Sequence, residues 1–272
     1  MPELPEVEVH RRPLAHWLTG RTVVSAGLRP AGMLPGTTAQ SLRKHLALAR
    51  FLAPVRRGKH LAIPVQDGGA RYLHLGMTGH FSRRGTVDPV PRFHALTLIL
   101  DDGHAVDFTD ARRFSRMGWL PTADADHTPP FNALGPDLLD APPSPAALMQ
   151  LLRASRRPVK LVLMDQAVVA GLGNIHVVEA LWRARIHPLR RADSLTLAEV
   201  RRLLTGIRQT FQLVLDDDDG ETLPYVTQGA PNPFKVYDRY LETCPRCRKG
   251  GIARETHGGR STYWCPVCQA LE

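Results

Sequence analysis

The first half of the chain carries strand-like runs of apolar and polar positions, from about residue 22 to residue 119. Residues 95–100 and 104–108 flank an Asp-Asp-Gly tripeptide, which predicts a β-hairpin. Residues 71–75 and the stretch after Gly79 predict another pair of strands around a glycine-flanked turn. This half of the chain is therefore expected to form β-sheet.

Helices are predicted before and after these strands in the sequence. Residues 5–18 predict a helix that ends at Gly20. Pro13 should kink or shorten that helix, because proline lacks the N–H that the helical ladder needs. After the strands the apolar spacing becomes helical, and Ser144 followed by Pro145 is typical of a helix N-cap and first position.

The clearest helix signal lies further on. Thr196 and Glu199 have the spacing of a capping box, which predicts a helix start. The apolar stripe that follows is expected in the core: Val200, Leu203, Leu204, Ile207, Phe211, Val214 and Leu215. The run Asp216–Asp219 suits a helix C-terminus poorly, so the helix should end before it, in a solvated loop. Residues 124–145, rich in Pro, Asp and Ala, predict a connection between two domains.

Composition narrows the class of protein. The 35 Lys and Arg residues outnumber the 26 Asp and Glu residues, which gives a formal net charge of +9. This balance favours a polyanionic partner, most often nucleic acid, although many basic proteins merely have solvated surfaces. No apolar run approaches the ~18 residues of a membrane span, so a soluble globular protein is expected.

All four cysteines lie near the C-terminus, in two C-x2-C pairs separated by 17 residues: Cys244, Cys247, Cys265 and Cys268. This spacing suits a tetrahedral site for one structural Zn²⁺, closed by four thiolates and with no open position for catalysis. Disulfides are the alternative, which the lack of a signal peptide and of surplus cysteines disfavours. The metal is expected to hold a short two-hairpin module with too little apolar surface to fold alone.

The N-terminus carries candidate chemistry. Pro2 follows Met1, and removal of the methionine would leave a secondary amine beside the carboxylate of Glu3. An α-amine titrates near ~7.7–8.0 and a lysine near ~10.4, so the terminus is the better nucleophile at neutral pH. Attack on a sugar C1′ would give an iminium with no N–H proton to lose, which favours elimination of a 3′ phosphate. The alternative is that Pro2 and Pro5 only shape the start of a helix.

A second candidate lies at Gly171, Gly173 and Asn174. Two glycines close to an Asn at a helix start expose backbone N–H groups to an anion, and a DNA phosphate would suit them. A tight turn between helices that uses glycine for positive φ explains the same residues equally well.

These segments together resemble the formamidopyrimidine-DNA glycosylase family. The opening PELPEVE, the HLGMTG turn, DARRF, LMDQ followed by GLGNI, and a terminal cysteine module with Arg260 occur in the family order and span essentially the whole chain. The resemblance implies an α+β, multi-domain fold. An N-terminal catalytic β-sandwich with flanking helices would cover residues 1–125 and a linker residues 126–143. A helix–two-turn–helix domain would cover residues 144–234 and a zinc finger residues 235–272.

The resemblance also implies a bifunctional glycosylase and lyase of base excision repair. Such an enzyme excises oxidised purines, 8-oxoguanine and formamidopyrimidines, from double-stranded DNA and then cleaves the strand at the abasic site by β,δ-elimination. It would act as a monomer in the bacterial cytoplasm, associated with the nucleoid. The related endonuclease VIII branch differs in its opening residues and in the residues that fill the space left by a flipped base.

The resemblance implies a role for each residue of this chain that matches a functional residue of the family. Pro2 resembles the nucleophile that forms a Schiff base with C1′, and Glu3 resembles the acid/base that protonates the opening sugar. Glu6 is expected to anchor the terminal turn. Lys59 matches the lysine credited with phosphate contact and β-elimination, although its basic context alone predicts a solvated turn. Arg260 matches the arginine that grips a phosphate and assists δ-elimination, because a guanidinium offers bidentate donors.

A flipped base leaves a gap that wedge residues fill. Met77 matches one family wedge, and Arg112 and Phe114 match the others, with Arg112 facing the orphaned base. Core packing is the more usual role of Met and Phe, but Met77 lies between glycines on a predicted turn. The candidates for phosphate contacts, with ordinary surface positions as the alternative for the histidines, are His74, His94, Arg113, Arg156 and Asn174.

Two other functions stay open from the sequence. One is the same enzyme class acting mainly on oxidised pyrimidines. The other is a DNA-damage or zinc-ribbon binding protein without catalysis, which would need neither Pro2 nor Glu3. Residues 222–231 match the position of the loop that closes over the flipped base, but their sequence departs from the common pattern, so lesion preference is not determined by this resemblance.

Overall fold

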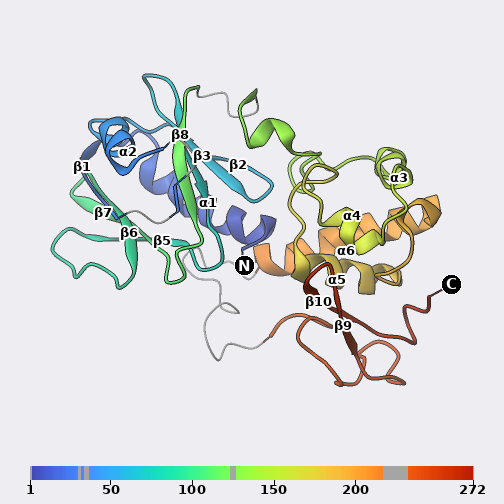
Figure 1. Cartoon of the computed structure of the whole chain (residues 1–272). Coiled ribbons are helices and arrows are strands. Elements are labelled where there is room, and N and C mark those ends of the chain that lie inside the picture. The colour runs from blue at the N-terminus through green and yellow to red at the C-terminus, as the bar shows by residue number, and fades with distance from the viewer. Residues whose placement is uncertain (1, 30–31, 34–36, 123–126, 217–231, 272) are drawn as a thin grey trace. The chain divides into compact units, whose positions relative to one another are not determined.

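The computed structural model describes residues 2–29, 32–33, 37–122, 127–216 and 232–271, and it contains two compact units (Figure 1). Of the described residues, the first unit contains residue 2 and those within 6–133, and the second contains residues 3–5, 134–216 and 232–271. The elements of the first unit are α1 (Leu4–Leu18, which starts in the second), β1 (Val23–Leu28), α2 (Ala39–Leu46), β2 (Val55–Arg57), β3 (His60–Pro64), β4 (Ala70–His74), β5 (His80–Gly85), β6 (His94–Leu100), β7 (His104–Thr109), β8 (Arg116–Leu120) and η2 (Phe131–Ala133). Those of the second are α3 (Pro145–Arg153), α4 (Val159–Leu163), α5 (Asn174–Ala184), η3 (Ala192–Ser194), α6 (Leu197–Asp216), β9 (Ala253–His257) and β10 (Arg260–Trp264).

The first unit is a sandwich of two antiparallel four-stranded sheets, in the orders β1-β6-β7-β5 and β2-β3-β4-β8. The predicted hairpin is confirmed, because β6 and β7 pair antiparallel, with Ile99 opposite Ala105. Side chains from both sheets, among them Phe108 and Leu61, share one core with α1 and α2. The fold class expected from the sequence is confirmed.

The second predicted strand pair is wrong in its pairing. β4 and β5 are strands, as expected, but they belong to different sheets. The turn between them carries the chain from one sheet to the other, because Leu75 and Phe81 on its two sides both enter the sandwich core. Gly79 permits the crossing, since a Cβ there would lie 2.6 Å from the Phe108 ring.

Helix α1 is not shortened by Pro13, which lies inside it. Burial of Val7, Leu14 and Leu18 outweighs the one hydrogen bond that proline removes. The helix ends where predicted, and Gly20 follows with φ of 77°.

The second unit is helical around one apolar core and ends in the two-stranded β9–β10 ribbon (Figure 1). Both predicted helix starts are confirmed: Ser144 Oγ accepts from Ala147 N at 3.2 Å, and Thr196 N donates to Glu199 Oε2 at 2.8 Å. The stripe of α6 is buried except at Leu204 and Leu215, which are only partly buried.

Helix α6 extends one residue further than predicted, because it includes Asp216. The Gln212 amide, one turn earlier, donates to the Asp216 carboxylate and offsets its poor position at the helix end. The rest of the aspartate run and the expected closing loop at 222–231 lie outside the described residues. No helix in the described part of the chain is long and apolar enough to cross a membrane.

Candidate functional site

Glu3 is held at the start of helix α5. Its carboxylate is 1% exposed and accepts backbone N–H groups from Gly173 at 2.6 Å, Ile175 at 2.8 Å and His176 at 3.3 Å. The first N–H groups of a helix have no partner within the helix, and their dipoles favour a negative charge. Glu3 therefore has a defined position, one residue after Pro2.

The anion at this helix start differs from the one expected. The sequence suggested a DNA phosphate at the Gly171–Asn174 segment, but the carboxylate of Glu3 occupies the N–H groups. The glycines allow the N-terminal residues to approach: a Cβ at Gly173 would lie 2.4 Å from Glu3 Cδ, and one at Gly171 would lie 2.2 Å from Leu4 Cδ1. Leu4 N also donates to Gly171 O at 3.1 Å.

The next side chain of α5 reaches the β9–β10 ribbon. Asn174 Nδ2 donates to Ser261 O at 2.9 Å, and Arg260 is the exposed neighbour of Ser261 at the start of β10. The turn before Arg260 uses Gly258 and Gly259, both at positive φ. Asn174 and Arg260, which lie far apart in the sequence, are thus brought to one place.

Sequence reasoning missed Lys160. It is fully buried, and its Nζ donates to Thr262 Oγ1 at 2.6 Å on the same ribbon. Burial, helped by the nearby charge of Arg260, lowers the pKa of Lys160 to about 8. The available signal was a single lysine within the apolar segment of α4, because a buried lysine needs a specific partner.

Arg156, the basic residue chosen from this region, lies at the surface. Its side chain is 86% exposed, and its Nε lies 3.9 Å from the Asp193 carboxylate. An exposed pair at this distance holds the side chain weakly. Arg156 can therefore still reach a polyanion, but nothing orients it for that contact as Thr262 orients Lys160.

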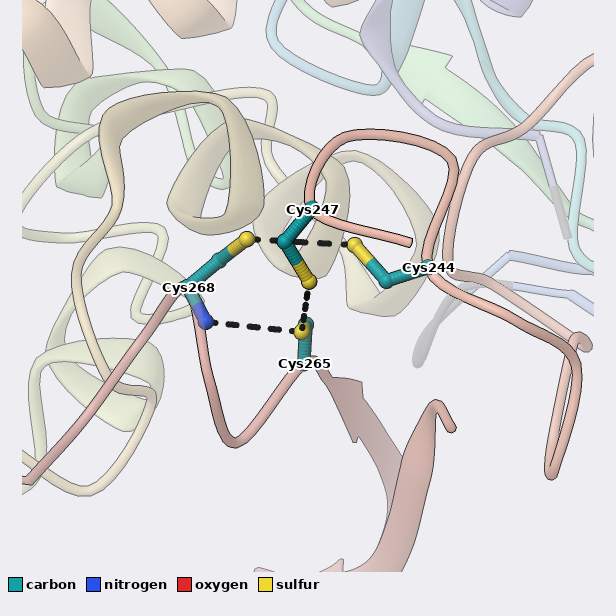
Figure 2. Close-up of side chains that lie close together, drawn as sticks. All are labelled: Cys244, Cys247, Cys265 and Cys268. Atoms are coloured by element: carbon teal, nitrogen blue, oxygen red, sulfur yellow. Dashed lines mark hydrogen bonds between the residues drawn. The ribbon is translucent and has the colours of Figure 1, made fainter. Parts of the chain in front are cut away.

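The four cysteine sulfurs form one cluster, shown in Figure 2. Cys244 and Cys268 Sγ are 3.8 Å apart, and Cys247 and Cys265 Sγ are 3.7 Å apart. Sulfurs at about 2.3 Å from a tetrahedral zinc are about 3.8 Å from one another, whereas a disulfide would need about 2.05 Å. An antiparallel bridge between Thr243 and Gly251 closes the first of the two hairpins. The cluster fits a tetrahedral metal ion.

This cluster is the only grouping of metal-binding side chains found in the described residues. In the second knuckle a backbone N–H turns toward the first cysteine, because Cys268 N donates to Cys265 Sγ at 3.4 Å. Such N–H donors stabilise a thiolate, which is the form that binds a metal.

In the first unit, Asp110 links the two loops that carry the wedge candidates, one with Met77 and the other with Arg112 and Phe114. One carboxylate oxygen accepts from Thr78 Oγ1 at 2.5 Å and Arg112 N at 3.2 Å, and the other accepts from Ser115 N at 2.7 Å. Burial alone would raise the pKa of Asp110, but these hydrogen bonds outweigh it and lower the pKa. Asp110 was not singled out from the sequence, although it is the first residue of DARRF.

The wedge candidates Met77, Arg112 and Phe114 lie on these two linked loops. Phe114 is 54% exposed, and the Arg112 guanidinium lies 4.9 Å from the centre of its ring. Met77 is half-buried and follows Gly76, where a Cβ would lie 2.4 Å from the Phe114 carbonyl carbon. Arg113 is exposed, with φ of 56°. The three wedge candidates are thus brought together.

Lys59 lies in the tight turn between β2 and β3 and is 7% exposed. Arg56 fixes this turn, because it donates to Gly58 O at 3.1 Å and pairs with Glu8 at 3.2 Å. Burial would raise the pKa of Glu8, but the neighbouring Arg11 and Arg56 hold it below its usual value.

Two histidines lie beside this turn. Burial lowers the pKa of His74 to about 4, and the charges of Lys59 and Arg116 act in the same direction. Burial, His74 and Lys59 likewise lower the pKa of His60 to about 3. His74 Nδ1 accepts from Gly76 N at 3.2 Å, so a neutral His74 carries its proton on Nε2 and can donate there.

The remaining candidates occupy defined positions in the first unit. His94 begins β6 and is paired with Thr109, next to Asp110. Glu6 is 2% exposed. Burial and the charge of His80 lower the pKa of the nearby His10 to about 4, and the charge of Glu6 acts in the opposite direction.

Comparison with known proteins identifies similar chains. Residues 1–117 match the family model described as the formamidopyrimidine-DNA glycosylase N-terminal domain, and residues 134–223 match its H2TH domain. A formamidopyrimidine-DNA glycosylase of Thermomicrobium roseum is 38% identical over 296 residues, which cover 100% of each chain.

Two solved structures are similar over nearly their full length. Formamidopyrimidine-DNA glycosylase of Lactococcus lactis, bound non-covalently to DNA with an AP site, has a TM-score of 0.86 and 29% identity and covers 99% of this chain and 100% of its own. MutM in complex with DNA containing carbocyclic 8-oxo-G has a TM-score of 0.86 and 30% identity, with the same coverage.

Proposed function

The chain belongs to the formamidopyrimidine-DNA glycosylase family, which acts on DNA in base excision repair, and we propose that it excises oxidised purines through a Schiff base on Pro2. The observation that carries this proposal is the anchoring of Glu3 by three N–H groups of α5, one residue after the amine. A protein that only recognised damage would not need a terminal amine beside this carboxylate.

The reaction uses Pro2 and Glu3 in turn. With the methionine removed, the neutral secondary amine attacks C1′ of the damaged nucleotide, and the bond from C1′ to the base breaks. Glu3 takes the proton that the attacking amine loses and passes it to O4′ as the ring opens, while the departing base takes a proton from water, which leaves an iminium between the proline nitrogen and C1′. The positive nitrogen then accepts electron density from C2′ when that carbon loses a proton, and the 3′ phosphate leaves.

Lys59 and Arg260 serve the elimination steps. Lys59, in a turn fixed by Arg56, contacts a phosphate and supplies or removes a proton during β-elimination. Arg260, exposed at the end of the β9–β10 turn, binds a phosphate and assists its departure in δ-elimination. Lys160 and Asn174 position Arg260, because both donate hydrogen bonds to the β9–β10 ribbon that carries it.

Access to C1′ requires the lesion to leave the base stack, at a cost of a few kcal/mol. Met77, Arg112 and Phe114 fill the gap and offset this cost, with Arg112 facing the opposite base. We propose that five side chains contact phosphates of the duplex: His74, His94, Arg113, Arg156 and Asn174. Glu6 anchors the terminal turn.

The cysteine cluster holds one structural Zn²⁺, supported by sulfur spacings of 3.7 and 3.8 Å. With four protein ligands the ion has no position open to substrate, so it stabilises the finger that presents Arg260. We propose a catalytic domain at residues 1–125, a linker at 126–143, a helix–two-turn–helix domain at 144–234 and a zinc finger at 235–272. For an enzyme that acts on DNA we propose a cytoplasmic, nucleoid-associated location.

Borohydride reduction with single-lesion duplexes tests the proposal. We expect a covalent adduct with the 8-oxoguanine duplex, and mass spectrometry should place the crosslink on Pro2. Capture only with pyrimidine lesions would replace the substrate class, and binding without any capture would indicate a protein that recognises damage without catalysis. A crosslink on a lysine would overturn the role of Pro2.

The substitution Asp110→Asn should disconnect the wedge loops. An amide keeps the size of the side chain but turns an NH2 group toward one of the N–H or O–H donors, so one charged hydrogen bond is lost, worth about 1.5–3 kcal/mol. We expect base opening, followed by 2-aminopurine fluorescence beside the lesion, to weaken about 10-fold or more. Asp88→Asn is the matched control, because Asp88 caps a distant loop by accepting from Gly85 N. Equal base opening in both variants would remove Asp110 from this role.

A further inference from the structure

The side-chain amide of Gln166 closes the turn between helices α4 and α5. Its Oε1 accepts from Gly171 N at 3.0 Å, and its Nε2 donates to Met164 O and Leu172 O, both at 2.9 Å. Two carbonyl acceptors and one N–H donor fit only one orientation of the amide, so the roles of its oxygen and nitrogen are fixed. Gln166 is the last residue of the LMDQ segment, and no step of the proposed reaction uses it.

One of these hydrogen bonds acts on the peptide group that holds Glu3. The carbonyl of Leu172 and the N–H of Gly173 belong to one planar trans peptide, so they point in opposite directions. Gln166 Nε2 binds the oxygen of this peptide. Glu3 Oε2 accepts its N–H at 2.6 Å, the shortest of the three hydrogen bonds to that carboxylate. A rotation of the peptide away from Gln166 therefore also turns its N–H away from Glu3.

The preceding residue of the turn also connects Gln166 to the N-terminal residues. Gly171 N is held by Gln166, and Gly171 O accepts from Leu4 N at 3.1 Å. Gly171 has φ of 120°, outside the helix and strand regions, so regular secondary structure does not fix this part of the chain. The backbone of Gln166 is held as well, because its carbonyl accepts from Gly135 N at 2.9 Å. The Gln166 side chain therefore starts from a fixed position.

We infer that Gln166 is a positioning residue for Glu3, because its amide fixes the Leu172–Gly173 peptide whose N–H binds the carboxylate. The inference rests on the excision reaction proposed above for its catalytic readout. Hydrogen bonds at the two ends of one peptide strengthen each other, since each polarises the group that makes the other. Loss of the Gln166 amide frees the Leu172 carbonyl to turn toward another donor, and the Gly173 N–H turns with it.

The substitution Gln166→Met tests this role, because methionine has a similar length but no amide. Single-turnover excision of 8-oxoguanine by the full chain should fall about 10–100-fold, since a small displacement of a catalytic group commonly costs that much. Duplex affinity should stay unchanged. Borohydride capture on a duplex with a preformed abasic site should also stay unchanged, because that sugar opens to its aldehyde without help from Glu3.

Ser144→Ala is the matched control. It also removes a side-chain hydrogen bond to the backbone, at Ala147 N, but in helix α3 rather than in the turn between α4 and α5. We expect its excision rate to match the unsubstituted protein. Unchanged excision in Gln166→Met would overturn the inference. An equal loss of abasic-site capture in Gln166→Met would also overturn it, because it would indicate general disruption of the unit.

A measurement on the unsubstituted protein keeps the inference testable if Gln166→Met does not fold. By NMR, the two side-chain amide protons of Gln166, each bonded to a carbonyl, should exchange with solvent about 10-fold more slowly or more than those of the exposed Gln209. Equal exchange at the two side chains would overturn the role of Gln166. Protected Gln166 protons in a protein that excises no lesion would instead overturn the proposed reaction, so the two failures are distinguishable.

Discussion

Replacement of Glu3 by glutamine is expected to reduce base excision by about 10²–10⁴-fold, the usual contribution of a general acid or base. The amide cannot deliver a proton to O4′. It also places an NH2 group against the N–H donors of Gly173, Ile175 or His176, which the carboxylate satisfies with both oxygens. Single-turnover excision of 8-oxoguanine from a duplex measures the loss. Duplex affinity should be retained, because Glu3 is buried.

A second pair of variants separates the position of Glu3 from its chemistry. In Gly173→Ala the new Cβ would lie 2.4 Å from Glu3 Cδ, so the carboxylate must move while remaining ionisable. Excision should fall with little change in duplex affinity. Gly27→Ala is the control, because its nearest neighbour, Thr97 Cβ, lies 3.9 Å away at ordinary contact distance. Unchanged excision in Glu3→Gln would remove Glu3 from the reaction.

Removal of the metal is expected to unfold the C-terminal finger. Structural zinc supplies about 10–16 kcal/mol of apparent binding free energy in small modules, more than a two-stranded ribbon can replace. Hydrogen exchange should lose protection at β9 and β10 but not at β6 and β7 of the sandwich. Duplex affinity should fall about 10–100-fold, as expected for loss of charged phosphate contacts such as that of Arg260.

Strand cleavage should also decrease when the finger unfolds, because Arg260 is the first residue of β10 in this finger. Addition of zinc should restore both protection and affinity, which distinguishes metal loss from irreversible damage. Tight duplex binding with all four cysteines free would show that the finger does not need the metal.

Local sequence patterns were sufficient to predict the elements that depend on residues close together in the chain. The 95–108 hairpin, the caps at Ser144 and Thr196 and the cysteine knuckles follow from turn residues and ligand spacing, whose partners lie within a few positions. Pro13 does not shorten α1, because tertiary burial of this helix outweighs one missing hydrogen bond. The pairing of β4 and β5 was wrong for the same reason: core packing, not proximity in the chain, selects the sheet.

The sequence by itself determined the class of fold, the family resemblance and the residue types able to carry the chemistry. Only the tertiary structure decided that the N–H groups of Gly173 and its neighbours bind Glu3, that Lys160 is buried beneath the ribbon and that Asp110 joins the wedge loops. The long-range contacts among these join residues between 32 and 173 positions apart. Their partners are set by burial and by hydrogen-bond satisfaction in three dimensions, which no local pattern of residues encodes.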